Sequence, residues 1–433
     1  MQEHNENTTI SLFIFRSNVK GMQYGMGTYI DELTQALMRF PEIKIYIVSY
    51  KNSEKKEFSV IKKSKRIFEI IIPKLSLTTE KDDRYNKRYA YSVVKFISEL
   101  IPGNEKVIFQ FNCLDDLPVI SRLKELYDLP TINIVHYALW QQIFGSNKSK
   151  LGGCNIDKPS GNIEVSLSRE REMYRQSDHI VSVTHYMKEF LISEYKIEEK
   201  KVSVIKNGLN HISPVQISEG EKAEIRKDLG FSEDEIIILF SGRLDPCKGV
   251  LFLMEAFERA CRKNSSLRLV MLGQGSVQDC QKKMKSAFGK VTFTGFLPKE
   301  TVMQFYKIAD MGVSPSIYDH CPYSVLEMMA DRIPLIMSRI NGLNELLSDD
   351  ECLFLNPVIS DEGDVTFNVE EMSELILTLA SDKDLRTRLA ENSYKTFERR
   401  FTAASMAEEM HNLFYSLLKQ RKPVIEYETS QGR

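Results

Sequence analysis

Two acidic residues lie eight positions apart in the stretch SIYDHCPYSVLEMMADRIPLIM. Asp319 stands in a polar turn and Glu327 in an otherwise apolar run, and burying an unpaired carboxylate is costly. Pro322 suits the first position of a helix through SVLEMMA, whose free amides near Tyr323 and Ser324 would suit an anion. Glu327 would then accept hydrogen bonds from neutral hydroxyls, such as the adjacent pair of a ribose. The alternative is an exposed helical glutamate.

Two cations stand in the stretch ILFSGRLDPCKGVLFLMEAF. We expect a buried strand to end at Ser241 and a helix to begin near Gly249, with Arg243 and Lys248 in the turn between them. A planar guanidinium and a compact ammonium both suit phosphate oxygens. The alternative is two solvated cations in a loop, but the strand–turn–helix context favours a phosphate site.

A third stretch, GMQYGMGTYIDEL, is rich in glycine and follows the first expected strand. Gly21, Gly25 and Gly27 would permit close backbone approach, and a helix beginning near Thr28 would direct free amides at an anion. Taken alone, the stretch is equally compatible with a flexible turn.

Short apolar, β-rich runs alternate with amphipathic stretches, which predicts βαβ units and parallel sheets covered on both faces. In such sheets ligands bind at the carboxyl ends of the strands, where the three stretches above would lie. The strands are expected at 10–15, 43–50, 68–73, 107–112, 131–137, 179–184 and 202–207, and again at 235–241, 267–273, 291–296, 311–316, 333–338 and 352–357.

The sequence predicts an α/β protein with two doubly wound, Rossmann-like domains. The first is expected over 1–210 and the second over 223–400, with a polar linker within 208–222 and a terminal helix over 401–420. We expect the terminal helix to cross back to the first domain. The stretch 141–162 is expected to be a long loop, with the length of a functional lid.

Composition excludes several classes of protein. The chain has 433 residues, 42% of them hydrophobic and 27% charged, and a formal net charge of −2, so general nucleic-acid binding is not expected. No apolar run approaches the roughly 20 residues of a membrane helix. The polar start MQEHNENTTI is unlike a signal peptide, and seven scattered cysteines without a C-x-x-C pair suit a reducing compartment. We therefore expect a cytoplasmic protein.

The basic stretch KNSEKKEFSVIKKSKR (51–66) could touch anionic lipid at the inner face of a membrane. The alternative is a solvated face, since Glu54 and Glu57 dilute its charge. No metal cofactor is expected, because H-E-x-x-H is missing from the sequence. The strict D-x-D at 382–384 is interpreted as a helix start, with Asp382 at its N-terminus.

Together these stretches resemble the retaining glycosyltransferases of the GT-B fold, specifically the large family four, or glycosyl transferases group 1, with its sucrose synthases and bacterial mannosyl- and glucosyltransferases. GRLDPCKG resembles the family's G-R-L-x-x-x-K-G, and Asp319 to Glu327 its E-x7-E. VSVIKNGLN, MLGQGS, VTFTGFLPKE and NGLNEL are similar to further landmarks, and the likeness covers about residues 10–400. The chain departs from the pattern in Asp319 for the usual Glu, in the turn HCPYS, and in Asp331 for a small residue.

The resemblance implies transfer of a hexose from a nucleoside-diphosphate sugar, most commonly of UDP, to an acceptor hydroxyl with retention. It implies a role in cell-surface glycan or glycoconjugate synthesis, with a glycan, lipid or peptide acceptor on the first domain. That acceptor is expected near the loops 75–90 and 141–162. Two other readings stay open, a nucleotide-sugar epimerase and a catalytically inactive nucleotide-sugar-binding subunit.

The resemblance also implies roles for individual residues. Arg243 and Lys248 would hold the donor diphosphate, Asp319 would contact the transferred sugar, and His136 would lie near that sugar in the cleft. Donor-binding roles are implied for Glu327 on the ribose, for the amides of Tyr323 and Ser324 on the diphosphate, for Gly25 and Gly27 facing the donor from the opposite domain, and for Gly295 and Phe296 near the base.

Overall fold

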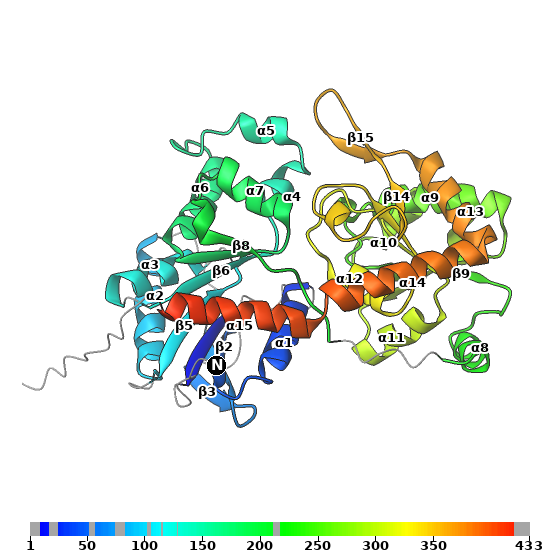
Figure 1. Cartoon of the computed structure of the whole chain (residues 1–433). Coiled ribbons are helices and arrows are strands. Elements are labelled where there is room, and N and C mark those ends of the chain that lie inside the picture. Colours follow the sequence, from blue (N-terminus) through cyan, green and yellow to red (C-terminus); the bar gives the residue numbers. More distant parts are fainter. Residues whose placement is uncertain are drawn as a thin grey trace, which may run out of the picture.

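The computed structural model describes residues 9–16, 25–51, 57–73, 83–101, 105–113, 116–127, 129–210 and 217–419, which form two α/β domains side by side (Figure 1). The first domain holds an eight-stranded sheet of order β3–β4–β2–β1–β5–β6–β7–β8, parallel except for β3. Its strands are β1 (Ile10–Arg16), β2 (Ile43–Lys51), β3 (Ser59–Lys62), β4 (Ile67–Pro73), β5 (Lys106–Phe111), β6 (Thr131–Val135), β7 (His179–Ser182) and β8 (Val202–Val204).

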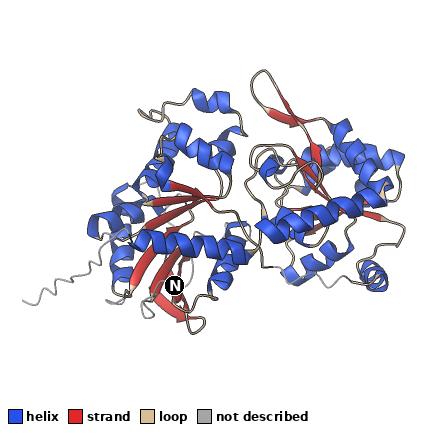
Figure 2. Ribbon diagram, viewed as in Figure 1, coloured by secondary structure: helices blue, strands red, loops and turns tan. Residues whose placement is uncertain are grey.

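Helices cover both faces of this sheet (Figure 2). Residues 12–15 of β1 are all apolar because both faces of the strand are buried: Leu12 and Ile14 face one core cluster, whereas Phe13 and Phe15 face the other. The helices of the first domain are α1 (Gly25–Leu37), α2 (Asp83–Ser98), α3 (Leu117–Leu126), α4 (Leu139–Phe144), α5 (Lys148–Gly152), α6 (Asn162–Gln176) and α7 (His185–Ser193).

The second domain holds a six-stranded parallel sheet of order β11–β10–β9–β12–β13–β14. Its strands are β9 (Ile236–Ser241), β10 (Leu267–Leu272), β11 (Val291–Gly295), β12 (Met311–Ser314), β13 (Leu335–Ser338) and β14 (Leu353–Leu355). Its helices are α8 (Glu219–Asp228), α9 (Val250–Lys263), α10 (Val277–Lys282), α11 (Lys299–Ile308), α12 (Tyr323–Ala330), α13 (Val369–Ser381) and α14 (Lys383–Arg400).

The chain passes between the domains twice. After β8 it runs into the second domain, and after α14 the helix α15 (Ala403–Lys419) returns to lie along α1 (Figure 1). The two crossings are bonded to each other, since Leu209 N–H donates to the Phe401 carbonyl (2.9 Å) and Ala403 N–H to the Leu209 carbonyl (3.1 Å). On the first domain, α15 is held by His411, whose Nε2 is 2.7 Å from Glu42 Oε1.

Two strand pairs were not expected from the sequence. Strand β3 lies within the basic stretch 51–66, of which 52–56 fall outside the described residues, and it pairs antiparallel with β4. The pair β15 (Pro357–Ile359) and β16 (Val365–Phe367) forms a hairpin on the second domain. Short strands of mixed polarity at a sheet edge lack the continuous apolar run that marks a buried strand.

The expectation of one long loop over 141–162 is wrong, because the end of α4 and the whole of α5 interrupt it, and the loop that remains before α6 runs over 153–161. Helix α5 also touches the second domain. Asn147 Nδ2 donates to the Glu362 carbonyl (2.7 Å), and Lys150 Nζ pairs with Asp364 Oδ1 (2.8 Å) on the β15–β16 hairpin.

Several helix starts were expected from the sequence, and α9 begins at Val250, next to the expected Gly249. Asp382 accepts a hydrogen bond from Leu385 N–H (2.8 Å) as the N-cap of α14, which confirms its interpretation as a helix acid. Helix α1 begins at Gly25 rather than near Thr28, and Gly21 lies outside the described residues. Pro322 is the N-cap of α12 rather than its first residue. No helix in the described part of the chain has both the length and the apolar character needed to cross a membrane.

Candidate functional site

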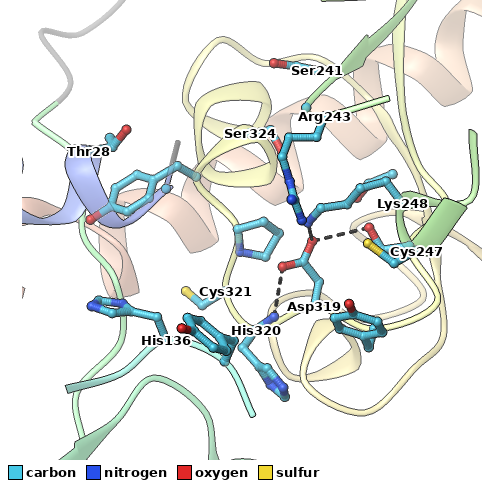
Figure 3. Close-up of a pocket in the computed structure, with 18 of the residues that line it drawn as sticks. Thr28, His136, Ser241, Arg243, Cys247, Lys248, Asp319, His320, Cys321 and Ser324 are labelled. Carbon is cyan, nitrogen blue, oxygen red and sulfur yellow. Dashed lines mark hydrogen bonds and ion pairs between the residues drawn. The ribbon is translucent and has the colours of Figure 1, made fainter. Parts of the chain in front are cut away.

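A cavity of about 840 Å³ lies between the two domains. On the second domain it opens at the carboxyl ends of β9 and β12, the neighbouring strands at which the strand order reverses. At such a switch point the loops that follow the two strands run in opposite directions, so a crevice that can hold a ligand opens between them. The residues that line it include Gly25, Thr28, His136, Asn207, Ser241, Arg243, Lys248, Gln274, Ser316, Asp319, His320, Ser324 and Glu327 (Figure 3).

The cationic turn follows β9, as the sequence predicts. It is shaped by the short 3-10 helix Pro246–Lys248, whose N-cap Asp245 accepts a hydrogen bond from Cys247 N–H (3.1 Å). Gly249 follows at φ +69°, and a Cβ there would lie 1.9 Å from the Pro315 carbonyl oxygen. Only glycine permits this approach, which brings Lys248 beside the loop that follows β12.

Asp319 is held by three donors within the second domain. Its Oδ2 is 2.5 Å from Lys248 Nζ and accepts a hydrogen bond from Ser316 Oγ (3.2 Å), while its Oδ1 accepts one from His320 N–H (3.0 Å) (Figure 3). Arg243 belongs to the same turn as Lys248, with Nη1 3.5 Å from Asp245 Oδ2. The resemblance assigns the Asp319 carboxylate to the sugar and the Lys248 ammonium to the diphosphate. In this structure the two groups form an ion pair with each other.

Helix α12 places its N-terminus and Glu327 on the cavity. The amides of Tyr323 and Ser324 lie in its first turn, while the buried Tyr323 hydroxyl donates to the Gly208 carbonyl (3.3 Å) and ties the helix to the linker. Glu327 accepts a hydrogen bond from Tyr306 Oη (2.8 Å). Burial raises the pKa of Glu327 from 4.5 to about 7, against a smaller lowering by that hydrogen bond.

The raised pKa makes a prediction for stability. Folded Glu327 binds a proton more tightly than the unfolded chain, so its contribution is present below pH 4.5 and is lost as the pH rises through about 7. Glu327→Gln keeps an acceptor for Tyr306 without the charge. We expect the ligand-free variant to match the wild type at pH 4.5 and to exceed its free energy of unfolding by up to about 3 kcal/mol at pH 8.

Denaturant titrations of both proteins at the two pH values would measure this difference. Glu170, whose pKa burial raises to about 7, contributes equally to both proteins and so cancels. A difference between variant and wild type that does not change with pH would contradict the assigned shift.

The opposite wall of the cavity belongs to the first domain. His136 follows β6, and its Nε2 is 3.1 Å from Asn112 Oδ1. Asn112 Nδ2 donates to the Phe15 carbonyl (2.9 Å), so Oδ1 faces the ring and Nε2 must carry the proton. Burial lowers the pKa of His136 to about 4. The ring is therefore neutral at pH 7, with Nδ1 as a hydrogen-bond acceptor.

Not every residue expected at the site lines this cavity. Gly25, at the start of α1, does, and a Cβ there would lie 3.9 Å from the ring of Tyr323. Gly27 is buried within the first turn of α1 and is not part of the lining. Gly295, the last residue of β11, and Phe296, which follows it, are also outside the lining, and Phe296 is 55% exposed. The Gly295 carbonyl accepts a hydrogen bond (3.2 Å) from the N–H of Gly273, the residue before Gln274 of the lining.

Sequence reasoning missed three residues that shape the site. Ser316 and His320 flank Asp319, and their spacing within the turn was the available signal for both. Tyr306 lies on α11, 21 residues before Glu327, and no local pattern connects the two. Among the described residues, no group of three or more His, Cys, Asp and Glu side chains is arranged to hold a metal ion.

Comparison with known proteins bears on both domains. Residues 221–396 match the family described as Glycosyl transferases group 1, and residues 24–211 match Glycosyltransferase Family 4. The uncharacterized glycosyltransferase MJ1607 of Methanocaldococcus jannaschii is 29% identical over 287 residues, 65% of this chain and 71% of that protein. The chain spans half of an alpha-D-kanosaminyltransferase of Streptomyces kanamyceticus, at 28% identity over 200 residues, which are 46% of this chain and 50% of that protein.

Solved structures share the arrangement of the two domains. Sucrose-phosphate synthase from Thermosynechococcus elongatus superposes with a TM-score of 0.72 at 19% identity, covering 96% of this chain and all of that one. Anabaena HepE in complex with UDP superposes with a TM-score of 0.68 at 14% identity, covering 94% and 100%. The two family matches lie one on each domain, and the group 1 match, over 221–396, contains the cationic turn, Asp319 and Glu327. The chain is therefore a member of the glycosyl transferases group 1, a glycosyltransferase of family 4 with the GT-B fold.

Proposed function

We propose that this glycosyltransferase moves a hexose, with retention, from a nucleoside-diphosphate sugar to an acceptor hydroxyl. The observation that carries the proposal is the convergence of Arg243, Lys248 and the N-terminus of α12 on one interdomain cavity. UDP is the proposed nucleotide, because HepE, which has the same fold, was solved in complex with UDP. A role in cell-surface glycan or glycoconjugate synthesis, which the resemblance to the family implies, is part of the proposal.

The chemistry requires positive charge at the leaving group. The bond between the anomeric carbon and the diphosphate oxygen breaks with its electron pair on the diphosphate, while the acceptor oxygen bonds to that carbon and passes its proton to an oxygen of the departing diphosphate. Preorganised donors stabilise the charge that develops on the phosphate. Arg243, Lys248 and the α12 amides would act there, Glu327 would hold the ribose, and Asp319 and neutral His136 would contact the sugar.

A thermal-shift screen against UDP, GDP and ADP would identify the nucleotide, since a ligand at about 100 times its Kd adds about 2.7 kcal/mol of stability. The selected sugar nucleotide would then be incubated with and without a panel of glycan, lipid and peptide acceptors. Transfer, or slow donor hydrolysis without acceptor, would support the proposal. An epimerised donor as the product would indicate an epimerase, and binding without any turnover would indicate an inactive nucleotide-sugar-binding subunit.

We expect the transfer to be independent of added metal, because side-chain cations and helix amides supply the charge on the diphosphate. Donor turnover measured with EDTA should equal turnover with Mg²⁺ or Mn²⁺ within about two-fold. The control is an enzyme with a known Mg²⁺ requirement in the same buffer. Loss of turnover with EDTA and its recovery with Mn²⁺ would contradict this expectation.

The acceptor is proposed to bind the first-domain wall of the cavity, around His136 and the exposed Gln142 at α4. The protein is proposed to act in the cytoplasm or at the inner face of a membrane. The basic segment around β3 would supply the lipid contact, since Lys62, Lys63 and Lys65 are exposed there. Sedimentation with anionic and neutral vesicles would separate the two locations.

A further inference from the structure

The turn that carries Asp319 is contacted by residues of the first domain as well as by residues of the second domain, to which it belongs. His320 is buried (5% exposed), and its ring lies between two side chains of the first domain. Its Nε2 is 2.5 Å from Gln141 Oε1 on α4, and its Nδ1 is 3.4 Å from Thr184 Oγ1 at the start of α7. The ring of Tyr186, also on α7, stacks on it with centroids 6.0 Å apart. Figure 3 shows His320 next to Asp319 on the cavity wall.

The hydrogen bonds around His320 form one consistent chain. Thr184 Oγ1 accepts from Met187 N–H (3.2 Å), so its hydroxyl proton is available to Nδ1 of the imidazole. Gln141 Nε2 donates to Ser146 Oγ (3.2 Å), and the other atom of the amide, Oε1, accepts from Nε2–H of His320. Burial lowers the pKa of His320 to about 4, so the ring is neutral and both of its nitrogens are satisfied.

The second domain fits closely around the same turn. Gly342 adopts φ +98°, and a Cβ there would lie 2.4 Å from the Asp319 carbonyl oxygen and 2.8 Å from His320 Nδ1. Cys321, which is not a glycine, adopts φ +50°, and its carbonyl accepts from Asn207 Nδ2 (2.7 Å) at the linker. A strained residue persists only where its surroundings determine its conformation. Here those surroundings come from both domains.

We propose that Gln141 and His320 are positioning residues, whose hydrogen bond across the cleft holds the Asp319 turn where its carboxylate meets the transferred sugar. The link to Asp319 is direct, because His320 N–H donates to Asp319 Oδ1 (3.0 Å) and cannot move without disturbing that carboxylate. The sugar subsite is then complete only when the domains are closed. The statement that the turn meets a transferred sugar rests on the proposed function. The hydrogen bond between Gln141 and His320 does not depend on it.

The test uses three variants of the full chain. Gln141→Leu keeps the approximate size of the side chain and removes the acceptor. Gln141→Glu restores an acceptor for the imidazole N–H. Ser146→Ala is the matched control, because it removes the other partner of the Gln141 amide and leaves the bond between the domains.

The first measurement needs no nucleotide. Cys321 is fully buried in the turn, so its alkylation by N-ethylmaleimide, followed by peptide mass spectrometry, reports opening of the turn. Cys280, equally buried within α10, is the internal reference. We expect Gln141→Leu to raise the ratio of Cys321 to Cys280 labelling at least about five-fold, because it leaves a buried imidazole N–H unpaired. Gln141→Glu and Ser146→Ala should label as the wild type does.

The second measurement separates the sugar from the nucleotide by calorimetric titration with UDP and with UDP-glucose. For Gln141→Leu we expect UDP-glucose to bind about ten-fold more weakly and UDP to change less than about two-fold, since only the sugar meets the displaced turn. Gln141→Glu should recover most of the affinity for UDP-glucose. A purely structural defect would weaken both ligands together.

Unchanged Cys321 labelling in Gln141→Leu would overturn the inference, and so would equal weakening of UDP and UDP-glucose. A wild-type chain that binds neither nucleotide would instead count against the proposed donor. In that case the labelling ratio still decides whether Gln141 holds the turn.

Discussion

Replacing Lys248 by alanine is expected to lower kcat/KM for the nucleotide-sugar donor by about 10²–10³-fold, which would be the largest effect among the cationic residues. The variant loses an ammonium at the proposed diphosphate site. It also leaves the Asp319 carboxylate, 2.5 Å away in the wild type, without its counter-charge. An uncompensated carboxylate next to an anionic ligand adds repulsion to the lost attraction.

Arg243→Ala should be less severe, at about 10–100-fold. Arg243 is 45% exposed, and its partner Asp245 can be solvated when the guanidinium is removed. Arg243→Lys should also be poor, because the lysine lacks the planar fork that holds two phosphate oxygens at once.

Steady-state donor kinetics with Lys263→Ala and Arg259→Ala as matched controls would check both expectations. These two cations lie on α9 in the same domain and pair with surface carboxylates of α13, so their removal should leave kcat/KM unchanged. Wild-type kcat/KM in Lys248→Ala would remove Lys248 from the proposed site.

Asp319→Asn is expected to lower turnover about 100-fold while UDP binds at least as tightly as it does to the wild type. The amide keeps the size of the side chain, and its oxygen can accept from His320 N–H, while its Nδ2, in place of Oδ2, can donate to Ser316 Oγ. It no longer neutralises Lys248, whose full charge becomes available to the diphosphate. Loss of sugar contact and gain of nucleotide affinity in one variant would distinguish Asp319 from a residue that only shapes the loop.

Asp319→Glu is the companion variant, because the usual family residue at this position is glutamate. The side chain gains one methylene, about 1.5 Å, in a turn where the carboxylate already meets three donors. We expect poor turnover, since the longer side chain would displace Lys248 or the turn. Turnover and UDP affinity that both stay at wild-type values in Asp319→Asn would leave Glu327 as the only functional member of the acidic pair.

Much of the fold follows from sequence, for a reason that β9 illustrates. Its residues from Ile237 to Phe240 are all buried, because a central parallel strand is covered on both faces and must be apolar throughout. Such runs are visible without any structure, and each expected strand has its counterpart. The edge strand β3 and the β15–β16 hairpin were not predicted, because their strands are short and partly exposed.

The cationic turn and the acidic pair could also be predicted, since each lies within one short stretch whose chemistry is local. The residue after Lys248 must be glycine, because the backbone there approaches Pro315 too closely for a side chain. This requirement is visible in the sequence as a glycine at a fixed position next to the lysine.

The sequence by itself therefore determined the α/β architecture, the positions of the apolar strands along the chain, and the residue types that are proposed to meet a phosphate and a sugar. Only the tertiary structure decided which of these groups form hydrogen bonds or ion pairs with each other. The ion pair of Lys248 with Asp319 spans 71 residues, and the hydrogen bond of Gln141 with His320 spans 179. Contacts at such separations depend on how two domains close on each other, and no local pattern of residues records that geometry.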